Sequence, residues 1–103
     1  MPAKSLNKWI KIDDENTHLE IHFTDGDIEV LLVDTKLVPF LEEIKWYWNK
    51  VLHKAYCKVF DPNPRNIMLS RTIVEFYLKT SNFNNVLMGN FHDYRFKNMV
   101  VRK

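Results

Sequence analysis

Alternation of apolar and polar residues over positions 18–23 constrains the fold of this chain more than any other feature. The segment reads HLEIHF, so apolar side chains fall on one side of an extended strand and polar side chains on the other. Asp25 and Gly26 follow as a tight-turn pair, and residues 28–33 return to an apolar, β-branched run. Residues 18–33 therefore predict a β-hairpin with one buried face.

Further strands are expected on both sides of this hairpin. Residues 9–12 are a candidate strand before it, and residues 56–60 and 67–69 are candidate strands after it. The sequence DPNPRN at 61–66 separates the last two, and its two prolines favour a turn and exclude a helix. Residues 7–69 are thus expected to be mainly β.

Two helices are expected among these strands. Asp34 or Thr35 is a candidate cap for a short helix that extends towards residue 44. Ser70 is a candidate cap for a second helix of about ten residues, because apolar side chains follow it at helical spacing. The Asn-rich stretch at 81–85 ends that helix. The predicted fold class is α+β, with an N-terminal antiparallel hairpin or sheet.

Length and composition favour one folded domain over residues 1–103, with 46% hydrophobic and 27% charged residues. No apolar run approaches the roughly 20 residues that span a bilayer, and the first residues do not resemble a signal peptide. We therefore expect a cytoplasmic protein without a membrane partner. Cys57 is the single cysteine, which excludes an intramolecular disulfide and a cysteine-based zinc site.

Net charge alone does not decide the function, whereas the histidine spacing argues against one metal site. The formal net charge of +2 is well below the excess that marks a dedicated nucleic-acid-binding domain. His18 and His22 lie on one face of a predicted strand, where a four-residue separation is about 13 Å and too long for one metal ion.

The C-terminal part of the chain carries a more specific pattern. Its segment NVLMGNFHDYRFKNM at 85–99 is similar to the signature Asp-His-x-x-Gly-Asn-x-x-Asp-Asn-Arg-x-x-Asn-Leu of homing-type HNH endonucleases. The segment MLSRTIVEF at 68–76 is similar to the start of the helix that precedes this signature in the family. Over residues 30–101 the chain therefore resembles the HNH family of phages. Five signature positions match in order: Gly89, Asn90, Asp93, Arg95 and Asn98.

The resemblance implies a ββα unit within residues 70–101, which in the family holds one divalent metal and cleaves DNA. Here, however, the general-base histidine of the signature is Val86, whose side chain can accept no proton. The aspartate ligand is Asn85, the middle asparagine is Tyr94, and the histidine at the helix start is Ser70. The resemblance thus implies an HNH-like protein that has no catalytic residue or cofactor and binds without cutting.

A working nuclease remains an alternative in which His92 acts as a displaced base beside Asp93. Mg²⁺ would then be required, with Asn85, Asp93 and Asn98 as vestigial ligands. Two other functions follow from loss of the base.

The favoured function is that of a phage-derived interaction protein. Such a protein would bind and inhibit a nuclease or nucleoprotein complex of host defence, as anti-CRISPR proteins do. Aromatic residues are expected as exposed anchors for the partner: Trp46, Trp48, Phe91 and Tyr94. The alternative is a module that binds double-stranded DNA through cations that contact phosphates: Lys54, Lys58, Arg65, Arg71, Arg95 and Lys97.

Overall fold

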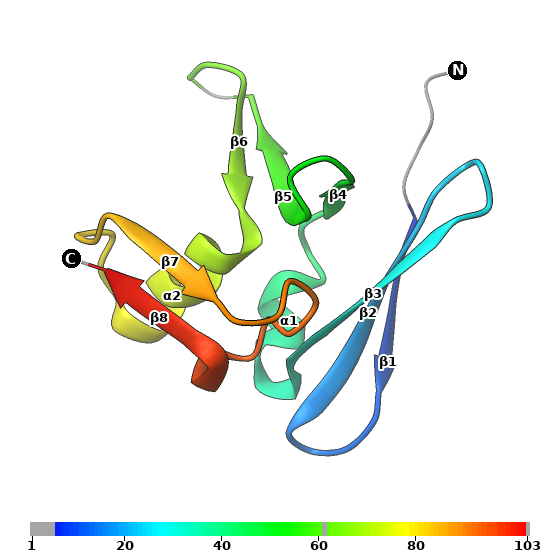
Figure 1. Ribbon diagram of the computed structural model, residues 1–103, viewed down its shortest axis with the longest axis horizontal. Coiled ribbons are helices and arrows are strands. Elements are labelled where there is room, and N and C mark those ends of the chain that lie inside the picture. Colours follow the sequence, from blue (N-terminus) through cyan, green and yellow to red (C-terminus); the bar gives the residue numbers. More distant parts are fainter. Residues whose placement is uncertain (1–5, 61, 103) are drawn as a thin grey trace.

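Three small antiparallel sheets form most of the structure, a computed structural model that describes residues 6–60 and 62–102 (Figure 1). Two α-helices and two 3₁₀ turns connect the strands of this described part. The predicted combination of helices with small antiparallel sheets is confirmed at this level. None of the helices described is long and apolar enough to cross a membrane.

The first sheet has the order β1 (Leu6–Lys11), β2 (Asn16–His22) and β3 (Ile28–Asp34). Leu19 pairs with Leu31 across the predicted hairpin, and both side chains are fully buried. Gly26 has a φ of +96° in the connecting turn, which glycine adopts without steric cost. The predicted hairpin is confirmed, and the strand expected at 9–12 is present from Leu6.

The connection to the second sheet is a 3₁₀ turn, Thr35–Leu37, followed by the short helix α1, Val38–Leu41. The predicted caps are wrong, because neither of these two elements has a side-chain cap. Thr35 lies within the 3₁₀ turn, and its hydroxyl bonds that of Thr17 at 2.8 Å. The Asp34 carboxylate is directed instead at groups much further along the chain, described below.

The second sheet has the order β4 (Tyr47–Asn49), β5 (Lys54–Val59) and β6 (Arg65–Met68). The strands expected at 56–60 and 67–69 are confirmed with boundaries shifted towards the N-terminus. Ala55 and Cys57 point into the core, so the alternate residues of β5 form the outer face.

Helix α2 (Leu69–Leu78) follows β6 without a loop. The predicted cap at Ser70 is wrong, because Ser70 lies inside the helix and the N-cap position is Met68. Lys79 ends the helix in a left-handed conformation with φ 55°. Residues 70–101 thus place a helix before a hairpin, and the ββα unit expected there is not confirmed.

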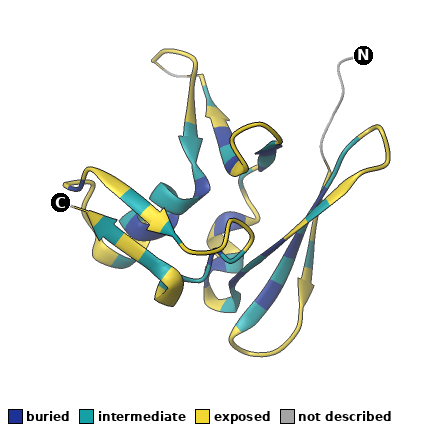
Figure 2. Ribbon diagram, in the orientation of Figure 1, coloured by how far each residue is buried: buried dark blue, intermediate teal, exposed yellow. Residues whose placement is uncertain are grey.

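That hairpin consists of β7 (Asn85–Met88) and β8 (Met99–Arg102), joined by a loop that ends in the 3₁₀ turn Phe96–Asn98. The loop crosses the edge of β3, where the Leu32 amide donates to the His92 carbonyl at 2.8 Å and the Tyr94 amide donates to the Leu32 carbonyl at 2.7 Å. These bonds hold the loop against the first sheet. Figure 2 shows the buried residues where the sheets, α1 and α2 meet.

Candidate binding site

A hollow of about 240 Å³ lies between the start of β5, the start of α2, and β7 with its following loop. Three of its lining residues are Ser70, Val86 and Tyr94, which occupy signature positions that carry histidine, histidine and asparagine in the HNH family. The fold therefore brings together three positions that are far apart in the sequence. The remaining lining residues are His53, Lys54, Leu87, Met88 and Phe91.

The chemistry of this hollow is mainly apolar. Val86 and Met88 offer aliphatic and thioether surface, and neither can take a proton from water. The Tyr94 hydroxyl is committed to the structure, because it accepts a hydrogen bond from the Ala55 amide at 3.0 Å. Burial raises the pKa of Tyr94, so it is a neutral phenol at physiological pH. The hollow is thus suited to receive an apolar group.

Asn85 and Asn98, the two amides that the resemblance aligns with metal ligands, lie at opposite ends of the C-terminal hairpin. Asn85 pairs with Arg102, whereas Asn98 directly precedes Met99, which pairs with Met88. At about 3.3 Å per residue, three strand positions separate the two amides by roughly 10 Å. Oxygen ligands of Mg²⁺ lie about 2.1 Å from the ion. This donor set does not fit one divalent cation, and no three His, Cys, Asp or Glu side chains within 6–60 and 62–102 gather as a metal site.

Asp93, the third residue considered as a metal ligand, is engaged in hydrogen bonds within the fold. Its carboxylate accepts two hydrogen bonds from the Arg95 guanidinium, at 2.9 and 2.7 Å, and a third from the Asn98 amide. Arg95 also donates to the Asn16 side chain at 3.2 Å. Three matched signature residues therefore fasten the loop to β2, and Arg95 is engaged in the fold.

The Asp93 contacts predict an acid-sensitive contribution to stability. The Arg95 guanidinium holds the pKa of Asp93 below its ordinary 3.8, because it favours the charged carboxylate. A depressed pKa gives stability that is complete above the ordinary pKa and is lost as pH falls through the lowered one. We expect Asp93→Asn to lower the free energy of unfolding by about 1–3 kcal/mol at neutral pH, and by less below the lowered pKa. Urea denaturation at neutral pH and below the lowered pKa of Asp93 measures the two free energies of unfolding, with Asp14→Asn as the exposed control. Equal losses of stability at the two pH values would contradict a stabilising role of the charged Asp93 carboxylate.

His92 is directed away from this hollow. Its Nε2 bonds the Glu29 carboxylate at 2.9 Å, and its ring stacks on Trp48 with centroids 5.0 Å apart. It is absent from the residues that line the hollow with Val86. The position of His92 therefore gives no support to a displaced base at the signature site.

The predicted exposure of three aromatic anchors is wrong. Trp46, Trp48 and Tyr94 are 0%, 5% and 2% exposed, because their rings fill the space between the sheets. Phe91 is the exception, with 55% exposure at the hollow. A partner could therefore reach Phe91 without unfolding the domain.

Arg71, a predicted contact residue, holds the loop after α2. Its guanidinium pairs with Glu75 at 3.3 Å, donates to the Ser81 carbonyl at 3.0 Å and lies 4.3 Å from the Phe83 ring centre. These contacts give Arg71 a structural role. Lys97, in contrast, is exposed.

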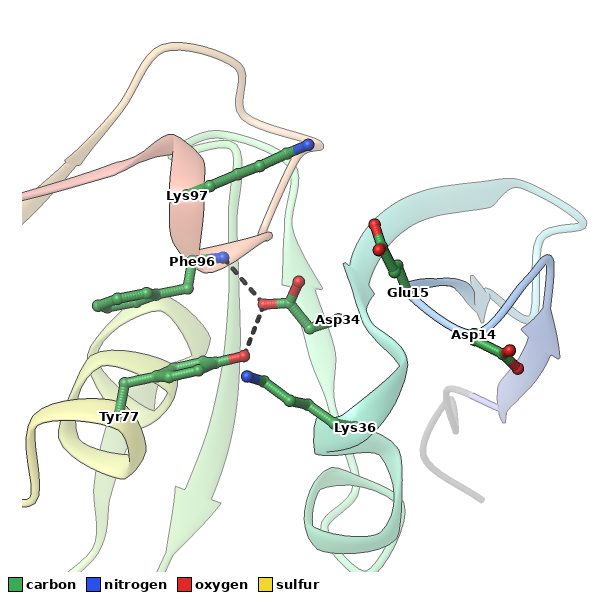
Figure 3. A pocket seen from close by; sticks show the side chains of 7 residues that line it. All are labelled: Asp14, Glu15, Asp34, Lys36, Tyr77, Phe96 and Lys97. Carbon is green, nitrogen blue, oxygen red and sulfur yellow. Dashed lines mark hydrogen bonds between the residues drawn. The ribbon is translucent and has the colours of Figure 1, made fainter.

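Lys97 borders a second cleft, of about 360 Å³, which Figure 3 shows from close by. Its central group is Asp34, whose Oδ2 accepts from the Tyr77 hydroxyl and from the Phe96 amide, each at 3.0 Å. Burial, reinforced by the Asp34 carboxylate, raises the pKa of Tyr77 above its ordinary value. No local sequence signal identifies this cluster, because its members come from three separate segments. Its bonds join β3 to α2 and to the last 3₁₀ turn.

No protein-family model, no curated protein and no solved structure matches this chain.

Proposed function

We propose that this chain is a non-catalytic, HNH-like binding protein of phage origin that docks on a nuclease or nucleoprotein complex of host defence. It would act in the cytoplasm of the host, in the manner of anti-CRISPR proteins. Its docking site is the apolar hollow at Ser70, Val86 and Tyr94. The observation that carries the proposal is that positions of catalytic groups in the resembled family meet here, with Val86 in place of the family's general-base histidine.

Exposed apolar side chains at the edge of the hollow favour a protein as the partner. Leu87 and Phe91 line it and are 46% and 55% exposed. Val51 and Leu52, which directly precede the lining residue His53, are 86% and 55% exposed. Exposed apolar side chains grouped around a concave site are typical of protein interaction surfaces.

Phe91 is the residue best placed to act as an anchor. Its ring stacks with that of His53 at a centroid distance of 5.7 Å, which orders it before binding. A side chain that is already ordered loses less conformational entropy when a partner binds, and this raises the affinity. We name the surface formed by Leu87, Phe91, Val51 and Leu52 the docking rim.

Inhibition assays test the proposal. Purified chain is added to DNA-cleavage reactions of host-defence nucleases, beginning with guide-loaded CRISPR effectors, and residual cleavage is measured against chain concentration. We expect stoichiometric inhibition of one of these enzymes. Phe91→Asp should weaken it at least about tenfold, because truncation of a central aromatic anchor commonly costs 2 kcal/mol or more.

The matched control is Phe60→Asp, which changes a 71% exposed phenylalanine that does not line the hollow. It should inhibit as the unchanged chain does. Equal inhibition by Phe91→Asp would exclude the hollow as the docking site, and lack of inhibition across the panel would overturn the proposed function. Mg²⁺-dependent cleavage of DNA by the chain alone, abolished in His92→Ala, would establish the nuclease alternative instead.

A further inference from the structure

Positive charge is concentrated in the part of the chain that forms the second sheet. Residues 44–74 contain four lysines, two arginines and one aspartate, a net charge of +5. The chain as a whole has +2, so the remaining residues carry −3. The small net charge of the protein therefore conceals a basic region next to acidic ones.

The outer face of the second sheet gathers much of this charge. Lys54, Tyr56 and Lys58 alternate with the buried Ala55 and Cys57 along β5, so all three project outward. Most of their neighbours across the sheet are polar or aromatic: Tyr47 pairs with Tyr56, Asn49 with Lys54 and Asn66 with Lys58, whereas Met68 also pairs with Tyr56. Strands β4, β5 and β6 contain no acidic residue.

The ammonium groups of two lysines lie near the ring of Tyr47 on this face. The Nζ of Lys58 is 4.8 Å from the Tyr47 ring centre, and that of Lys45 is 5.5 Å from it. Tyr47 and Tyr56 stack with centroids 5.6 Å apart. Among the described residues, no ion pair neutralises Lys45, Lys54 or Lys58. These ammonium groups are therefore available to an external anion.

We propose that this face, formed by Lys45, Tyr47, Lys54, Tyr56, Lys58 and Asn66, binds the sugar-phosphate backbone of a nucleic acid. Lysine, tyrosine hydroxyl and asparagine amide are the groups that commonly contact phosphate oxygens. Lys54 and Lys58 are about 13 Å apart along β5, the axial length of about four phosphates of one strand. The face adjoins the hollow, because Lys54 also lines it, but its binding of phosphates does not depend on the proposed function.

The test measures binding of fluorescein-labelled oligonucleotides by anisotropy at about 50 and 200 mM salt. Single-stranded DNA, duplex DNA and RNA of one sequence are the three probes, and their order of affinity identifies the source of the phosphates. The variant Lys45→Gln/Lys54→Gln/Lys58→Gln is compared with Lys11→Gln/Lys36→Gln/Lys97→Gln, which removes the same charge from other parts of the surface.

We expect the sheet variant to lose at least about tenfold in affinity, and its salt dependence to become shallower by roughly 2–3 in log–log slope, about one for each lysine. The control variant should keep the slope of the unchanged chain. Equal losses in both variants, competition by polyglutamate as strong as by DNA, or no binding of any probe at low salt would each overturn the proposal. Phe91→Ala, which removes the aromatic anchor without placing a carboxylate in the hollow that Lys54 lines, should bind nucleic acid normally, so failure of the docking rim and failure of this face are distinguishable.

Discussion

Replacement of Trp46 by alanine is expected to lower the free energy of unfolding by about 3–5 kcal/mol. The indole is 0% exposed, and its Nε1 donates a hydrogen bond to the Leu41 carbonyl at 3.0 Å. The backbone of Trp46 is also held by the Asn7 side chain, which accepts from its amide at 2.7 Å and donates to its carbonyl at 2.9 Å. A cavity at this position would therefore open beside a contact that joins β1 to the chain before β4.

Thermal and urea denaturation measure this loss. A change of 3 kcal/mol corresponds to a fall in Tm of at least about 12 °C for a domain of this size. Trp46→Phe should lose less, since it keeps most of the ring volume, and Phe60→Ala should stay within about 0.5 kcal/mol, as a surface substitution does. If the Trp46→Ala variant were as stable as the unchanged chain and had lost only partner binding, Trp46 would be an exposed anchor and not a core residue.

The N-terminal hairpin could be predicted because its signal is local. The alternation around Leu19 and Ile21 fixes which face is buried, and Gly26 marks the turn. Strand β4 was not predicted, since its three residues, Tyr47–Asn49, are too few to display a period. Pairing with β5 defines that strand, and such pairing is a tertiary property.

The two helix caps failed for different reasons. Ser70 lies one residue inside a helix that begins at Leu69. Asp34 stands at the N-cap position of the 3₁₀ turn, but residue-type preference is a weak guide where a distant group competes for the side chain. Asp34 receives donors from residues 43 and 62 positions further along the chain. The sequence around Asp34 contains no trace of either.

The candidate site was predictable only in part. Of the contact residues expected from the sequence, Phe91 and Tyr94 line the hollow. Two others, Trp46 and Trp48, are buried, and the guanidinium groups of Arg71 and Arg95 bind groups of the fold itself. Exposure could not be inferred, because a buried tryptophan and an interfacial one have the same residue type. The basic face was anticipated only at Lys54 and Lys58, since net charge averages the +5 of residues 44–74 with the −3 of the rest.

Loss of the Asp34 carboxylate is expected to destabilise the C-terminal half more than loss of either of its donors. Asp34→Ala leaves the Tyr77 hydroxyl and the Phe96 amide without their acceptor, and an unpaired, partly buried donor costs about 1–3 kcal/mol. The Tyr77 ring, stacked on Phe96 with centroids 4.2 Å apart, would lose its orientation as well. We therefore expect a loss of about 2–4 kcal/mol for Asp34→Ala and about 1 kcal/mol for Tyr77→Phe.

A double-mutant cycle separates this junction from a general effect of charge at Asp34. If the hydroxyl and the carboxylate act together, the double variant is more stable than the sum of the single losses predicts, by about 0.5–3 kcal/mol, because one interaction is removed only once. Additive losses would instead mean that Tyr77 is held by its stacking on Phe96 alone. Lys36→Gln is the control, since its ammonium lies 4.7 Å from the Tyr77 ring centre on the exposed side of the cleft and should contribute less than about 1 kcal/mol. A coupled cycle would establish that β3 and α2 are joined through the Asp34 carboxylate and the Tyr77 hydroxyl.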